Sequence, residues 1–193
     1  MIKSIVIGIL VLFFQAGFYT YAGEFVSNIL NQSQSLGMVT NNHPVVSQKD
    51  VLFIVKHCKS PNIVVYQANR TSQKDLDPEK PVDVYWLMNT KGKKTESLTY
   101  IEWKMAFGFK LNTLVKGKKY TISLNAVKDK EITISQNTSG EFEGFIKING
   151  VFSKLKDVFV NFEYSFGLPD VKYVDFTGFD LKSGKLITER IWA

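Results

Sequence analysis

Short runs of alternating apolar and polar residues fill most of the chain after residue 50. Glycine, proline and asparagine separate these runs about every eight to twelve residues, which is the spacing of short strands and their turns. Each such strand buries one face and exposes the other. About ten runs of this kind predict an all-β fold, mainly antiparallel, and the pattern fits either a barrel or a sandwich.

The clearest turn is Asn149-Gly150, which lies between two apolar-rich runs. A two-residue hairpin loop of type I′ needs positive φ at both central residues, and asparagine followed by glycine tolerates this best. We therefore expect a tight hairpin here. Two further hairpins are expected, at the sequence GLPD (167–170) and at Lys-Ser-Gly (182–184).

One stretch, LTYIEWKMAFG at 98–108, fits two structures. As a strand, its apolar residues from Ile101 onward alternate with polar or small ones. As a helix, Thr99 and Glu102 make a capping box, and Gly108 stands where a helix-ending glycine belongs. The caps at both ends favour a short buried helix over 99–107 that closes one end of a barrel or covers a sheet, and the strand is the alternative.

The first 22 residues have the features of a secretory signal. Lys3 precedes an apolar run at 5–14, and small residues up to Ala22 are spaced like a signal-peptidase site. A retained membrane anchor is the alternative, but it needs roughly 20 apolar residues, and Gln15 ends this run after about ten. We predict a secreted or periplasmic protein with no transmembrane span after cleavage.

Two parts follow the predicted signal. Residues 23–50 are rich in asparagine and serine and have no sustained hydrophobic period, which is typical of a flexible arm. Residues 51–193 have the length of one domain of ordinary size. We therefore expect a single β-rich domain after the arm.

Composition narrows the possible partners. The net charge is +6, so an exported chain of this kind has an anionic envelope surface as a candidate partner, and nucleic acid is not expected. The single cysteine, Cys58, has no internal partner, and we expect it to be buried as a small hydrophobe. Only His43 and His57 are present, so no metal site is expected, and no motif indicates a cofactor.

Three segments resemble a known family: VDVYWLMN, SLTYIEWKMAFGF and VKYVDFTGFDLKSGKLITERI, in this order and spacing. The shared features are a Pro-x-x-Val-Tyr-Trp strand that begins at Pro81, a Tyr-Ile segment from Tyr100 to Gly108, and a terminal hairpin. The chain is similar over most of 51–191 to the uncharacterised family catalogued as domain of unknown function 4833. The resemblance implies a discrete exported β-rich domain, and it supplies neither an activity nor a site residue.

Candidate chemistry is sparse. There is no nucleophile elbow, P-loop or dinucleotide-binding glycine pattern, so paired carboxylates are the remaining acid–base candidates and no catalytic residue is assigned. If GLPD forms the loop, Phe162 faces Asp175, which then lies on an otherwise apolar face. The best polar cluster comprises Asp83, Tyr85, Glu102, Lys104 and Asp175. The candidate binding residues are Asp83, Tyr85, Trp86, Tyr100, Glu102, Lys104, Tyr164, Tyr173 and Asp175.

Aromatic residues make up 13% of the chain and alternate along the predicted strands. In a small barrel such residues fill the interior, and in a larger one they line a ligand cavity. We therefore expect a non-enzymatic binding module for an apolar or amphipathic small molecule or an envelope component. The alternatives are an envelope hydrolase that uses Asp175 with Asp83 or Glu102, and an interaction module that presents a sheet edge or its basic loops.

Overall fold

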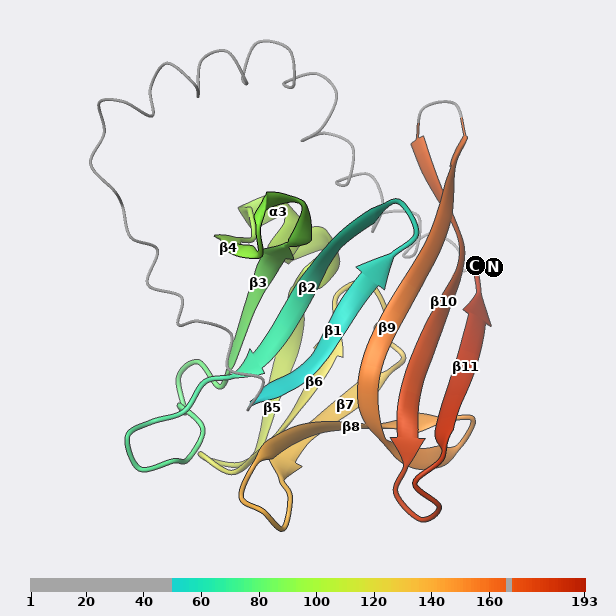
Figure 1. Ribbon diagram of the computed structural model, residues 1–193. Helices are drawn as coiled ribbons and strands as arrows, with labels where there is room; N and C mark the ends of the chain where they lie inside the picture. Colours follow the sequence, from blue (N-terminus) through green and yellow to red (C-terminus); the bar gives the residue numbers. More distant parts are fainter. Residues whose placement is uncertain (1–49, 166–167) are drawn as a thin grey trace, which may run out of the picture.

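The computed structural model describes residues 50–165 and 168–193. These residues form eleven strands in one curled sheet, so the predicted all-β fold is confirmed (Figure 1). The predicted signal, 1–22, and all of the predicted arm except Asp50 lie outside the described residues. The first strand begins directly after Asp50.

The strands, in chain order, are β1 (Val51–His57), β2 (Ser60–Ala68), β3 (Val82–Met88), β4 (Lys94–Ser97), β5 (Phe109–Val115), β6 (Lys119–Leu124), β7 (Glu131–Gln136), β8 (Phe142–Ile148), β9 (Val151–Ser165), β10 (Leu168–Asp180) and β11 (Leu186–Trp192). Three short helical segments accompany them: η1 (Asn89–Lys91), α3 (Tyr100–Glu102) and η2 (Trp103–Phe107), the last a π-helical turn that continues α3.

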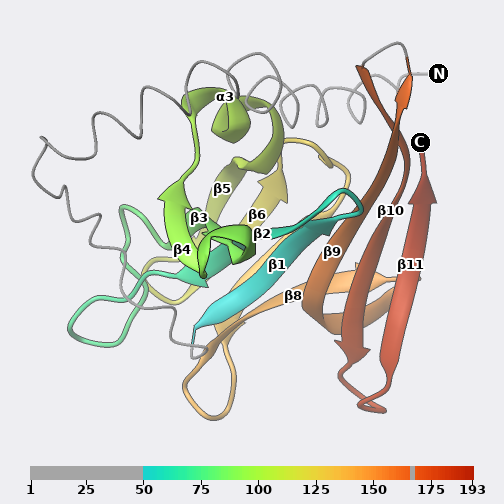
Figure 2. The ribbon, with the colours of Figure 1, turned by 45° about the horizontal axis from the view of Figure 1, so that its top comes forward.

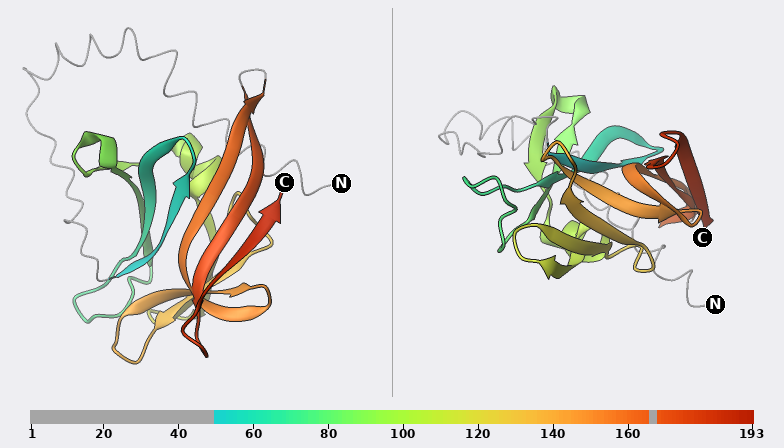
Figure 3. Two further views of the ribbon diagram at one scale, coloured as in Figure 1. Left: turned by 45° about the vertical axis from the view of Figure 1, so that its right-hand side comes forward. Right: turned by 90° about the horizontal axis from the view of Figure 1, so that it is seen from below.

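The long strand β9 organises the sheet. Its first residues pair with β8, its middle pairs in parallel with β1, and its other edge pairs along most of its length with β10. The strand order in the sheet is β4-β3-β2-β1-β9-β8-β7-β6-β5, with β10 on the other edge of β9 and β11 paired to β10. All of these pairs except β1–β9 are antiparallel. Strands β1–β4 and β5–β8 therefore curl toward each other, and β9–β11 extend to one side (Figure 3).

The core fills the space inside the curl. Phe53 and Tyr66 stack with ring centroids 4.3 Å apart, and both are fully buried. Phe162 and Phe176, from the aromatic strands that the sequence singled out, are also fully buried. Burying a side chain of this size contributes about 2–3 kcal/mol each. These inward-facing aromatic residues therefore fill the interior.

The turn at Asn149-Gly150 is as predicted. Both residues have positive φ, 50° and 79°, and Ile148 pairs with Val151 directly across it. The register of the next hairpin was predicted wrongly. β9 and β10 pair as far as Ser165 and Leu168, so GLPD is not a four-residue loop.

This change of register moves Asp175 away from its predicted place. Phe162 faces Val171, and Asp175 faces Phe159 on the other face of β9, because the strands pair closer to the loop and a bulge follows Val171. Asp175 is therefore not on the buried apolar face. Cys58, expected to be buried, is exposed in the turn between β1 and β2.

The helix predicted over 99–107 is present, as α3 and η2, but most of it is not buried. Tyr100 is 74% exposed and Trp103 is 37% exposed, whereas Ala106 and Phe107 enter the core. Figure 2 shows that α3 lies at one end of the domain, beyond the start of β5. The start of this helical segment is therefore exposed, and its end is packed into the core.

Candidate functional site

The two motifs of the family resemblance meet at the start of α3. The indole Nε1 of Trp86, in β3, donates to Glu102 Oε1 at 3.2 Å. Glu102 Oε2 accepts from the backbone N–H and the hydroxyl of Thr99, at 2.7 and 2.8 Å. The hydroxyl of Thr99 accepts in turn from the Glu102 backbone N–H at 3.3 Å, so the predicted capping box is confirmed.

The last turn of this segment is packed into the core. Phe107 meets the ring of Trp86 edge-on, with centroids 5.3 Å apart, and its carbonyl accepts from the Tyr66 hydroxyl at 2.7 Å. Complete burial raises the pKa of Tyr66 far above its ordinary value, so this hydroxyl keeps its proton and remains a donor. The helical turn is therefore fixed to β2 and β3.

Gly108 allows the turn to close tightly, although not in the way the sequence suggested. Its φ of −71° and ψ of 171° are extended, whereas a helix-ending glycine has positive φ. Its N–H donates to the Trp103 carbonyl at 2.7 Å, and a Cβ at this position would lie 2.1 Å from the same oxygen. Glycine is thus required by close contact.

The outer side of the turn is apolar and exposed. Tyr100, Ile101 and Trp103 expose 74%, 48% and 37% of their surface, and Trp103 rests edge-on against Phe109 with ring centroids 5.2 Å apart. The ammonium of Lys104 lies 5.6 Å from the centre of the Tyr100 ring. We call the segment Tyr100–Lys104 the aromatic turn.

Asp83 and Tyr85 lie on the face of β3 opposite to Trp86. Asp83 forms an ion pair with Lys80, and the hydroxyl of Tyr85 donates to Gln67 Oε1 at 2.6 Å. Burial, with a contribution from the nearby Asp83 carboxylate, raises the pKa of Tyr85 to about 12. These two residues therefore have local partners of their own.

Tyr173 and Asp175 belong to a third place, on the outer face of β10 and β11. Asp175 accepts two hydrogen bonds from the guanidinium of Arg190, both at 2.7 Å, and this guanidinium lies 3.6 Å from the centre of the Tyr173 ring. Trp192 follows on the same face, with its ring 5.4 Å from Tyr173. This arrangement fixes Arg190 and occupies both oxygens of Asp175.

Tyr164 stands apart from all of these. It is exposed near the end of β9, edge-on to Phe162 and 5.8 Å from the ammonium of Lys59. The nine candidate residues are therefore spread over four places. Asp83 and Asp175 lie on strands four places apart in the sheet order, and each has a cationic partner of its own, Lys80 and Arg190.

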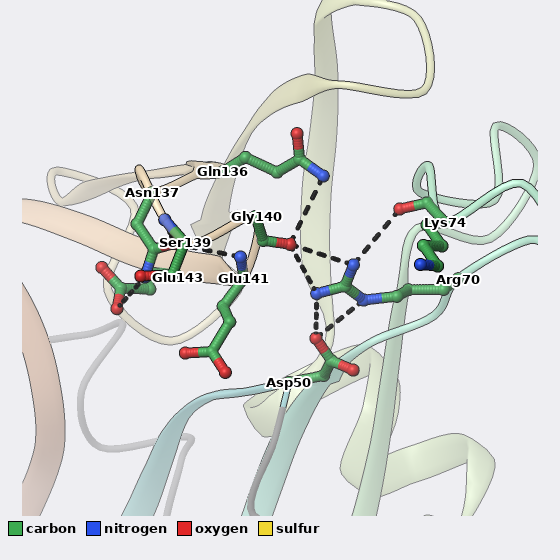
Figure 4. A network of polar contacts seen from close by, with 9 residues as sticks. All are labelled: Asp50, Arg70, Lys74, Gln136, Asn137, Ser139, Gly140, Glu141 and Glu143. Carbon is green, nitrogen blue, oxygen red and sulfur yellow. Dashed lines mark hydrogen bonds and ion pairs between the residues drawn. The ribbon is translucent and has the colours of Figure 1, made fainter.

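Sequence reasoning missed a polar network around Arg70, where Asp50, the loop after β2 and the turn between β7 and β8 meet (Figure 4). The guanidinium of Arg70 donates to Asp50, and also to the carbonyl of Gly140 at 3.1 Å and that of Lys74 at 3.3 Å. It also lies 4.8 Å from the centre of the Phe142 ring. All five N–H groups of Arg70 are used, so this residue joins three segments structurally.

Ile101, Trp103, Arg190 and Trp192 were also missed as surface residues. The sequence placed Ile101 and Trp103 on a buried helix, and periodicity alone could not show which side was open. Within 50–165 and 168–193, no group of three metal-ligating side chains comes together. In the same residues, no helix has the length and hydropathy needed to cross a bilayer.

The curled sheet and the capped turn joined to it define an all-β domain in which the Trp86 and Tyr100 motifs form one unit. The chain belongs to the family described as "Domain of unknown function (DUF4833)", whose model matches residues 53–190. The match includes the aromatic turn and the Asp175–Arg190 pair. No curated protein and no solved structure matches the chain.

Proposed function

We propose that this domain is a non-enzymatic binding module that uses the aromatic turn to hold an amphipathic envelope component. The observation that carries this proposal is the exposure of Tyr100, Ile101 and Trp103 within four residues of one turn that is fixed from below. Large apolar surfaces that remain exposed mark binding sites. A fixed surface also loses little conformational entropy on binding.

The packing of the core supports a surface site over a site inside the sheet. Phe162 and Phe176 are buried against neighbouring side chains, as are Phe53 and Tyr66. These side chains stabilise the fold whether or not a ligand is present. The aromatic residues of the turn have no comparable structural role on their exposed side.

The state of the carboxylates supports binding over hydrolysis. Glu102 is engaged by Thr99 and Trp86, and Asp175 is engaged by Arg190. A general acid–base pair must reach one bond from two sides, at roughly 5–10 Å from each other. Asp83 and Asp175 lie on strands four places apart and form separate ion pairs with Lys80 and Arg190, which favours structural roles for both.

Hydrogen exchange read by mass spectrometry tests the proposal. The chain without residues 1–22 is incubated with the envelope fraction of its host, and we expect slower exchange over 98–108. The double variant Tyr100→Ser and Ile101→Ser, which changes only exposed side chains, should lose this protection. Unchanged exchange over 98–108, or protection that persists in the double variant, would refute the proposal.

A further inference from the structure

We infer that the component held by the aromatic turn is the surface of an anionic phospholipid bilayer. This inference rests on the proposed function and adds the chemistry of the partner. Tyr100, Ile101 and Trp103 would enter the interfacial layer, while the neighbouring lysines meet the headgroups. Three properties of the turn argue for lipid: the type of its exposed side chains, the internal partners of two of its carbonyls, and the lysines on and beside it.

The exposed side chains are those that favour the interface between membrane and water. Tyrosine and tryptophan combine an apolar ring with one polar group, and they are enriched at the level of the headgroups. In the described part of the chain, neither the Tyr100 hydroxyl nor the Trp103 indole N–H has a hydrogen-bond partner. Both groups are therefore available to headgroup oxygens and water.

Two backbone carbonyls of the turn have a side-chain partner within the protein. The carbonyls of Trp103 and Lys104 each accept from the amide of Asn125, at 3.1 and 3.2 Å, and the Trp103 N–H donates to Thr99 at 2.9 Å. A helix end normally leaves its last carbonyls without internal partners. Backbone that enters a layer poor in water must have such partners. Asn125 thus gives these two carbonyls a partner that does not depend on water.

A protein partner would fit this surface less well. Protein interfaces carry about one hydrogen bond per 100–200 Å² of buried surface. The aromatic turn offers few polar groups for that purpose, because the carbonyls of Trp103 and Lys104 and the carboxylate of Glu102 are already engaged. The surface is also a projecting turn, which suits insertion into a soft layer.

Lysines outnumber acidic residues on and beside the turn. Lys104 lies on the turn, Lys110 follows two residues after Gly108, and Lys128 lies three residues beyond Asn125; all three are exposed, as is Asp129 beside Lys128. The acidic residue of the turn, Glu102, points inward to Trp86 and Thr99. Lysines near an anionic membrane surface each raise affinity about fivefold.

Flotation with lipid vesicles tests the inference. The chain without residues 1–22 is mixed with vesicles of phosphatidylglycerol and phosphatidylcholine, or with vesicles of phosphatidylcholine alone. We expect binding to the anionic vesicles, at least about tenfold weaker binding to the neutral ones, and loss of affinity as salt is raised. Absence of binding to the anionic vesicles at low salt would overturn the inference.

Variants locate the contact. Trp103→Ala should lower affinity about tenfold or more, and Lys104→Ala about fivefold. Trp192→Ala is the matched control, because Trp192 is 67% exposed but lies on the outer face beside Tyr173. Equal losses for Trp103→Ala and Trp192→Ala would overturn the placement on the turn. If Trp103→Ala lowers the Tm of the domain, the double variant Tyr100→Ser and Ile101→Ser is compared with Trp192→Ala for vesicle affinity instead.

The two proposals fail in different ways. If the envelope fraction protects 98–108 and anionic vesicles do not bind, the turn is a binding surface for another component and only the lipid inference is wrong. If the envelope fraction does not protect 98–108 and the anionic vesicles do not bind the chain, the proposed function is wrong as well. Protection that survives extraction of lipid from the envelope fraction would also refute the lipid inference.

Discussion

Replacing Glu102 by alanine should loosen the aromatic turn and destabilise the domain. The carboxylate accepts hydrogen bonds from the backbone and the hydroxyl of Thr99 and from the indole of Trp86. Loss of a capping interaction costs about 1 kcal/mol, and loss of a hydrogen bond to a charged group costs about 1.5 kcal/mol or more. We therefore expect Glu102→Ala to lower the free energy of unfolding by about 2–3 kcal/mol.

Urea and thermal unfolding measure this loss. For a domain of this size it corresponds to a fall in Tm of about 5–10 °C. Glu96→Ala is the control, because this exposed carboxylate pairs only with Lys91 and its removal should cost less than about 0.5 kcal/mol. In a double-mutant cycle, Thr99→Ala should cost less in the Glu102→Ala background than alone. A loss below about 1 kcal/mol for Glu102→Ala, or full additivity, would refute the reasoning.

Three further predictions test other parts of the fold. Gly108→Ala forces a Cβ against a backbone oxygen, so it should lower the free energy of unfolding in urea by about 2–3 kcal/mol. Gly184→Ala is the control: its Cβ meets open space at positive φ, and it should cost about 1 kcal/mol. A larger loss for Gly184→Ala than for Gly108→Ala would contradict the argument. Burial lowers the pKa of His57 to about 4, so the unfolded chain takes up the proton first. The free energy of unfolding should therefore fall as the pH drops from about 6.5 to about 4. His57→Gln should flatten this pH dependence, and an unchanged slope in the variant would count against the role of His57. Arg70→Lys keeps the charge but loses most of the hydrogen-bond donors, so thermal unfolding should show a fall of about 2 kcal/mol in the free energy of unfolding. A fall within experimental error would mean that the Arg70 network adds little to stability.

The sequence was most informative where one local rule acts alone. Positive φ at Asn149 and Gly150 follows from the two residue types, and the capping box follows from the spacing of Thr99 and Glu102. Alternation of apolar residues was enough to predict most of the strands and the apolar face that carries Phe162, but not the short strand β4 or the continuity of β9.

The sequence failed where a position depends on distant parts of the chain. The register of β9 and β10 includes a bulge after Val171, which no turn motif encodes, so Asp175 was placed on the wrong face. The exposure of Tyr100 and Trp103 depends on where α3 lies relative to the sheet edge. The partnership of Asp175 with Arg190 needed the same tertiary information, because the two residues are on different strands.

The parallel pairing of β1 with β9 bears on the order in which the domain can form. Lys56 and Asp157, which bond across this pair, are 101 positions apart in the chain. Strands β1–β4 can pair with one another as soon as they are made, but one edge of this group stays open until β9 is available. Contacts between distant positions slow folding, since a long loop must close before they form. The last third of the chain therefore decides when the domain becomes complete, and a chain shortened before β9 would keep an open strand edge that can pair with other chains.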